Sequence, residues 1–151
     1  MTLLTDDVRD RLRANAGAHH DAVRRRQAEP DPAPVVKFFN PVGAATWLAT
    51  ELDMDGDTLF GLADLGFGCP ELGSFSLREI AAVRLPFGLA IERDLGFASR
   101  LPLSVWAATA RRCGSILHAE TSLTQASRAA ARRAAGTPAP FPTPPDAGDG
   151  G

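Results

Sequence analysis

The strongest constraint on the fold is a series of short β-type runs separated by tight turns between residues 35 and 65. Val35–Phe39 is β-branched and aromatic, and residues 45–52 form a second apolar run. Asp55-Gly56 supplies the left-handed residues of a tight hairpin turn. Residues 58–65 follow as a third run that is apolar on both faces, so we expect it inside the sheet. Three strands joined by short turns predict an antiparallel meander.

The residues before these strands predict a long helix. Thr5 is a suitable N-cap, and Asp6 and Asp7 place negative charge in the first turn. We therefore predict a helix over residues 6–27. Residues 29–34 contain three prolines, which predict a stiff linker between this helix and the sheet.

Beyond the third strand, turn residues alternate with short regular segments. Residues 66–73 form a glycine-rich loop that leads to a brief strand at 74–75. Ser76 and Glu79 then have the spacing of a capping box, which predicts a short helix to about Arg84.

Two further elements complete the predicted domain. Residues 89–94 combine an inward-facing Ile91 with charged neighbours, as an edge strand does. Ser104 can cap a helix that ends before Gly114, because a glycine commonly follows a helix end. We expect Trp47, in the second strand, and Trp106, in this helix, to be buried.

The C-terminal residues differ in composition from this domain. Ser122 and Gln125 have capping-box spacing, and residues 115–135 read as a marginal helix rich in alanine and arginine. Residues 136–151 are rich in proline and glycine and are expected to be a disordered tail.

These patterns predict an α+β fold. It has an N-terminal helix, an antiparallel meander of four to five strands, and a short and a longer helix packed on one face. One domain covers residues 3–114, with its sheet and later helices at 35–114, and the Pro-rich tail follows.

Composition restricts the class of protein. The net charge of −2 is too small to steer the whole chain towards nucleic acid or anionic lipid. Two cysteines are too few for a disulfide scaffold, and acids occupy the positions where a signal peptide has basic residues. No apolar stretch approaches the ~20 residues of a membrane span. We expect a soluble cytoplasmic protein with no membrane contact and no cofactor.

Carboxylates of the hairpin are the most suggestive chemical set. Together with a strand lysine they could hold Mg²⁺ or Mn²⁺ for hydrolysis of a phosphodiester or another substrate. The candidate catalytic residues are Lys37, Glu51, Asp64, Glu71 and Glu92. Asp53 belongs to the same hairpin. The alternative, which we favour, is that these acids solubilise a hairpin and pair with basic residues.

Three other motifs fail on spacing. The acidic turn at residues 53–57 lacks the final glutamate of a calcium loop, because Leu62 occupies that position. Gly66 and Gly68 lack the third glycine of a dinucleotide fingerprint. The cysteines and histidines have none of the close pairs that bind zinc: Cys69, Cys113, His19, His20 and His118.

Arginine clusters are the other candidate binding feature. Basic residues of predicted helices could contact phosphates if they converge: Arg24, Arg25, Arg26, Arg111, Arg112, Arg128, Arg132 and Arg133. No aromatic residues interleave with them to stack on bases. The alternative is that they are solvated helix faces.

Five motifs follow one another along the chain: VKFF at 36–39, TWLATELD at 46–53, FGLADLGFGCPELG at 60–73, SLRE at 76–79 and IERDL at 91–95. This ordered set resembles a bacterial domain family of unknown function that is often carried by plasmids and integrative elements, and the resemblance covers roughly residues 3–113. The chain departs from it at Phe75, where that family usually has tyrosine. The positions shared with the family pattern are Lys37, Trp47, Glu51, Asp64, Pro70, Glu71, Glu92 and Arg93.

The resemblance implies an accessory protein of mobile-element or defence gene neighbourhoods, with no activity assigned. Two functional hypotheses follow. The first, which we prefer, is a non-catalytic module that binds a protein or a nucleic acid through a sheet edge, the glycine-rich loop and the basic helices. The second is a metal-dependent hydrolase that uses the hairpin carboxylates.

Overall fold

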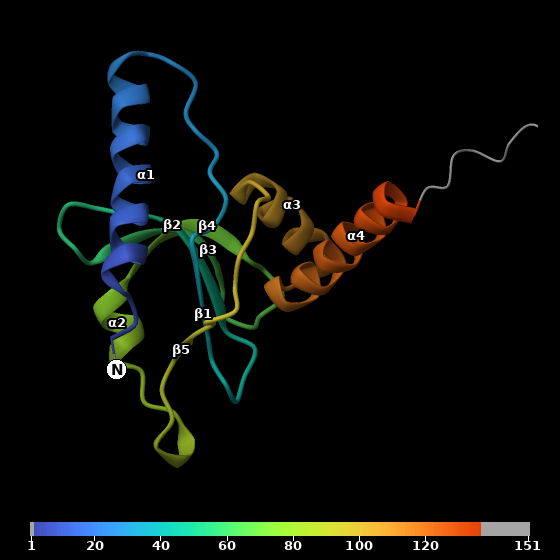
Figure 1. Ribbon diagram of the computed structural model, residues 1–151. Helices are drawn as coiled ribbons and strands as arrows, with labels where there is room; N and C mark the ends of the chain where they lie inside the picture. The colour runs from blue at the N-terminus through green and yellow to red at the C-terminus, as the bar shows by residue number, and fades with distance from the viewer. Residues whose placement is uncertain (1, 137–151) are drawn as a thin grey trace, which may run out of the picture. The chain divides into compact units, whose positions relative to one another are not determined.

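The computed structural model describes residues 2–136, which contain one five-stranded antiparallel sheet and helices on both of its faces (Figure 1). The strand order is β4-β3-β2-β1-β5. Along the chain the elements are α1 (Asp6–Arg24), β1 (Val36–Phe39), β2 (Thr46–Leu52), β3 (Thr58–Asp64), β4 (Glu71–Ser76), α2 (Leu77–Ala82), the 3₁₀ turn η1 (Pro86–Gly88), β5 (Glu92–Arg93), α3 (Leu103–Cys113) and α4 (Ile116–Gly136). The predicted α+β class and meander are confirmed, whereas the edge strand predicted over residues 89–94 covers only Glu92–Arg93.

The β2–β3 hairpin is the centre of the sheet. Its turn closes with the N–H of Asp53 donating to the carbonyl of Thr58, and Gly56 has the positive φ of 73° that the turn requires. Farther along, the pairing register shifts between Ala49 and Glu51. Beside this irregularity a Cβ on Gly61 would lie 1.8 Å from the carbonyl oxygen of a β2 residue, so the close approach of the strands requires glycine.

Helices α1 and α2 cover one face of the sheet. Leu12 of α1 and Ile80 of α2 belong to one buried cluster with strand residues such as Phe38 and Leu59. The predicted burial of Ile91 is confirmed, because its side chain belongs to the same cluster. This cluster is the main apolar core of the domain.

Helix α3 covers the opposite face (Figure 1). Leu48 and Leu62 alternate along the strands with the residues of the main core and are fully buried. Trp106 is also buried, and its indole N–H donates to the hydroxyl of Ser99 over 3.0 Å. The expected burial of Trp47 and Trp106 is confirmed, whereas the short and the longer helix lie on opposite faces rather than on one.

The first helix is shorter than predicted and ends at Arg24. Arg26 has a positive φ of 54°, its N–H donates to the carbonyl of Val23, and the N–H of Gln27 donates to the carbonyl of Ala22. These two bonds form a Schellman motif, which satisfies the last carbonyls of the helix. The motif commonly uses glycine, and an arginine in its place gave no signal to end the predicted helix before Gln27.

Two later helices begin at positions other than the predicted caps. Ser104 lies inside α3, where the Asp31 carboxylate of the linker accepts from both its N–H and its hydroxyl. Ser122 lies inside α4, which begins at Ile116 instead. The capping box predicted there was wrong, because Asp64 and Ser115 already satisfy the first N–H groups of the helix.

Strand β4 begins at Glu71, three residues earlier than predicted, because the glycine-rich loop ends at Pro70. The chain divides into two compact units after Ala119, within α4. The predicted disordered tail at 136–151 lies, apart from Gly136, outside the described residues. No helix among residues 2–136 is both long enough and apolar enough to cross a bilayer.

Replacing Trp47 with alanine is expected to lower the free energy of unfolding by about 3–5 kcal/mol, as for other large buried aromatic side chains. Trp47 is 8% exposed, whereas Met54 is 92% exposed. Chemical denaturation of both alanine variants checks this expectation, with Met54→Ala as the control that leaves the midpoint unchanged. Equal midpoints for the two variants would contradict the packing described above.

Candidate functional site

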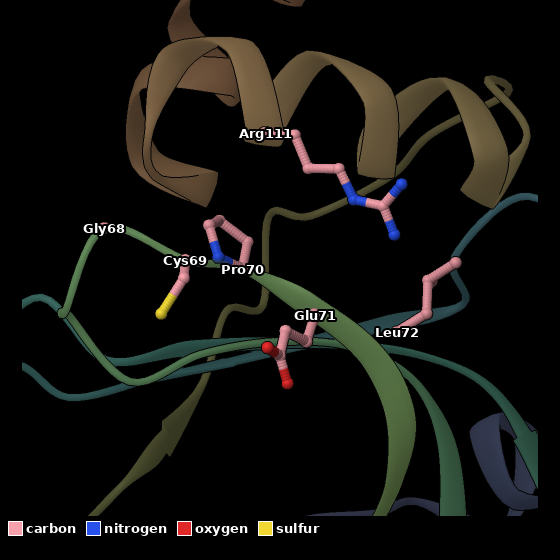
Figure 2. Close-up of a pocket in the computed structure, with 6 residues that line it drawn as sticks. All are labelled: Gly68, Cys69, Pro70, Glu71, Leu72 and Arg111. Atoms are coloured by element: carbon pink, nitrogen blue, oxygen red, sulfur yellow. The ribbon is translucent and has the colours of Figure 1, made fainter.

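The candidate site is a pocket where the glycine-rich loop meets β4 beneath α3 (Figure 2). Its volume is about 510 Å³, and its lining residues are Gly68, Cys69, Pro70, Glu71, Leu72 and Arg111. Apart from the arginine, all of them belong to the loop and the first residues of the edge strand. The pocket therefore combines strand backbone with one cationic side chain.

A buried carboxylate joins the glycine-rich loop to the start of α4. Asp64 is fully buried at the end of β3. One of its oxygens accepts from the N–H of Gly66 over 2.8 Å, and the other accepts from the N–H of Ile116 over 2.9 Å. The same side chain thus accepts from the first turn of the loop and caps α4, which begins shortly after the end of α3. Gly66 and Gly68 turn the loop with φ values of 92° and 84°.

Arg111 is the cation of the pocket. Its side chain reaches from α3 towards β4, while the carboxylate of Glu71 points away from it (Figure 2). Among residues 2–136, no carboxylate lies within ion-pair distance of its guanidinium. An arginine without an internal counterion can form paired hydrogen bonds with a carboxylate or phosphate from outside.

Strand β4 is an open edge of the sheet. Beyond its end, the N–H of Leu77 donates to the carbonyl of Asp57, which marks these two residues as a hydrogen-bonded pair. Antiparallel ladders alternate, so the hydrogen-bonding groups of Phe75 point to β3, whereas those of Leu72 and Ser74 point outwards. Within the described chain, the outward groups have no partner. The edge therefore has free backbone donors and acceptors.

The carboxylates predicted as a metal set lie apart from one another. Glu51 pairs with Phe60 and Asp64 with Thr46, so the two acids are at opposite ends of the β2–β3 hairpin. Glu71 is on β4 at one edge of the sheet, and Glu92 is on β5 at the other. Among residues 2–136, no three histidine, cysteine, aspartate or glutamate residues could hold a metal ion together.

Lys37 is separate from that hairpin as well. Its side chain is almost completely buried, with its ammonium 3.3 Å from the carboxylate of Asp94 and 5.8 Å from the ring centroid of Phe39. The pairing of a buried ammonium with a carboxylate offsets its cost of desolvation. Lys37 therefore links β1 to the segment after β5 through this ion pair.

The hairpin acids serve as hydrogen-bond acceptors for backbone groups. Asp57 accepts from the N–H of Arg78 in α2 and from the hydroxyl of Ser76, and these bonds lower its pKa, the Arg78 bond having the larger effect. Asp55 accepts from the hydroxyl of Thr58 and from the N–H groups of Thr58 and Asp57. These bonds, the hydroxyl first, lower the pKa of Asp55 from 3.8 to about 2.

The predicted basic clusters belong to three helices. Arg24, Arg25 and Arg26 are exposed at the end of α1 and directly after it. Arg111 and Arg112 are exposed at the end of α3. Arg128, Arg132 and Arg133 are exposed on the part of α4 that follows Ala119 and belongs to the second unit. The prediction that these clusters bind a partner stays open on this geometry.

The sequence analysis did not predict the pair formed by His19 and Glu51. Nδ1 of His19 lies 3.1 Å from both oxygens of Glu51, and its Nε2 lies 3.5 Å from Glu29 in the linker. The spacing of Leu12, Ala16 and His19 puts the histidine on the stripe of α1 that faces the sheet, which was the available signal. The pair connects α1, β2 and the linker.

The fold and the site define a small α+β domain with an open sheet edge beside an arginine-containing pocket. Residues 3–117 match the model of the family described as a protein of unknown function, DUF2958. The match covers more than half of the chain, which therefore belongs to that family. No curated protein and no solved structure matches the chain.

The low pKa of Asp55 predicts a pH dependence of stability. A carboxylate with a lowered pKa in the folded state stabilises the fold above its unfolded pKa, and this contribution is lost as pH falls through the folded pKa. The melting temperature of the wild type should therefore fall between about pH 4 and pH 2 more steeply than that of Asp55→Asn. Thr58→Val, which lacks the hydroxyl donor, should have an intermediate slope. Parallel melting profiles for all three proteins would show that the hydrogen bonds of Asp55 do not lower its pKa in the folded state.

Proposed function

We propose that this protein is a non-catalytic binding module that takes up an extended segment of a partner protein along β4. The observation that carries this proposal is the open edge of that strand. Its outward backbone groups match those of an added strand, which would extend the sheet by one member. We also propose that the module acts in the cytoplasm, as an accessory of mobile-element or defence genes, which the motif resemblance suggests.

The composition of β4 supports strand addition. Proteins commonly protect an edge strand with proline, lysine, an inward-pointing charge or a bulge. The six residues of β4 contain no proline and no lysine, and its only charged residue, Glu71, is at its start. Its pairing with β3 is regular over its whole length. The edge is thus long enough and regular enough for a partner strand.

Ser74→Pro tests strand addition, because it removes an outward N–H and leaves the bonds between β4 and β3 intact. The full-length wild type is used to select binders from a displayed library of random linear peptides. Selected peptides are expected to bind Ser74→Ala as they bind the wild type and to lose binding to Ser74→Pro. Fluorescence anisotropy measures the affinities, and circular dichroism shows whether each variant is folded.

Leu72→Pro removes a second outward N–H and is expected to have the same effect. Peptides that bind both proline variants with wild-type affinity would overturn the proposal. Failure of the wild type to enrich any peptide would overturn it as well.

A nucleic acid is the second candidate partner, and the observation that favours it is the charge of α4. Residues 121–136 contain three arginines, all exposed, and no acid. Arg128 and Arg132 are four residues apart and so project from the same face of the helix. Such a helix can contact phosphates without reading sequence.

If α4 binds nucleic acid, the logarithm of the affinity should fall linearly with the logarithm of the salt concentration. Replacing Arg128, Arg132 and Arg133 together with alanine should flatten that slope, because fewer counterions are released. Filter binding of random-sequence duplex DNA over a salt series measures it, with Arg24→Ala on α1 as the control. An unchanged slope in the triple variant would exclude α4 as the interface.

A further inference from the structure

We propose that the segment bound along β4 carries an aspartate or glutamate side chain directly opposite Leu72, where its carboxylate pairs with Arg111. This inference rests on the strand addition proposed above and adds the chemistry of the partner. It makes Arg111 the residue that determines specificity at the edge.

The side-chain direction in the sheet selects this position. Leu48, Leu62 and Leu72 lie opposite one another on adjacent strands, so their side chains share a face of the sheet. The first two are buried on the face that α3 covers. A residue paired with Leu72 from outside would therefore project its side chain towards α3 and Arg111. Its neighbours in the added strand would project away from α3.

The charges at the edge favour an acid at this position. Glu71, next to Leu72, points away from Arg111 (Figure 2). No carboxylate of residues 2–136 pairs with the guanidinium. A lysine or arginine opposite Leu72 would be repelled, and a neutral residue would leave the guanidinium without a counterion. The pocket of about 510 Å³ has room for a carboxylate side chain beside Leu72.

The backbone of β4 makes the side-chain position specific. The outward N–H and carbonyl of Leu72 would form a hydrogen-bonded pair with the residue opposite. This pairing sets the register of the added strand, so that one residue of the partner meets Arg111. Backbone bonds would supply affinity, and the charge pair would select the sequence.

The test uses the peptides selected on the full-length wild type. They are expected to share an acidic residue at one position within an alternating extended pattern. Replacing that residue with its amide should weaken binding by about tenfold or more, the usual scale for a hydrogen bond to a charged group. Arg111→Ala should weaken the acidic peptide equally and leave the amide peptide unchanged, because the two changes remove one interaction.

Arg112→Ala is the matched control, because Arg112 is the next residue of α3, is exposed and does not line the pocket. It should leave the affinity for the acidic peptide unchanged, and Arg111→Glu should prefer a peptide with lysine at the same position. Equal losses in Arg111→Ala and Arg112→Ala would overturn the inference in favour of a diffuse charge effect.

Three further outcomes decide between this inference and the proposed function. Peptides that require the Ser74 N–H and ignore Arg111 would overturn the inference and leave strand addition standing. Sensitivity to amidation of the peptide C-terminus, without sensitivity to the acidic side chain, would assign Arg111 to a terminal carboxylate and overturn the inference. Peptides whose binding depends neither on the Ser74 N–H nor on Arg111 would overturn both proposals.

Discussion

The arrangement of this domain depends on aspartates that accept hydrogen bonds from helix N-termini far away in the sequence. Asp64 is the most important of them, because it is fully buried and has two backbone N–H groups as its partners, one in the loop before β4 and one in the first turn of α4. Asp31 accepts a hydrogen bond from the N–H of Ser104 in the first turn of α3, and Asp57 accepts one from the N–H of Arg78 in the first turn of α2. An unpaired buried N–H costs about 1–3 kcal/mol, so Asp64, whose bond to Ile116 is buried, favours the start of α4 at that residue. The helices are thus tied to the sheet and its linker by polar contacts as well as by apolar packing.

The hydrogen bonds of Asp64 help to explain how a pocket forms at the edge of the sheet. Asp64 ends β3, turns the chain into the glycine-rich loop and holds the start of α4 beside it. Since α3 ends immediately before α4, Arg111 in its last turn is brought over the first residues of β4. The carboxylate that the sequence analysis weighed as a metal ligand instead joins the start of the loop to the first turn of α4. Its burial and its two N–H partners account for an aspartate at this place.

The open edge is a feature that soluble proteins usually protect, and here the two edges of the sheet differ. The β5 edge has only two residues, and Lys37 binds Asp94 immediately after it. The β4 edge has six residues, a regular ladder and outward backbone groups beside a cation without a counterion. An exposed edge of this length is prone to aggregation unless a partner covers it. The proposed function assigns that partner to β4, and the further inference gives Arg111 the role of selecting an acidic residue in it.

The sequence by itself determined the elements whose signals are local. The three strands of the meander, the Asp55-Gly56 turn, the first helix and the burial of Trp47 and Trp106 follow from alternation, turn chemistry and helical spacing, which act within a few residues. Only the tertiary structure decided the helix starts at α3 and α4, because Asp31 and Asp64 are separated from their N–H partners by 73 and 52 residues. The end of α1 is set by local bonds, but no sequence signal marks it, because an arginine adopts a conformation that favours glycine. The pocket, the direction of the free N–H groups of β4 and the pairing of His19 with Glu51 depend on register and on contacts between distant segments. No local pattern encodes these contacts, since they arise when the sheet brings its edges, loops and helices together.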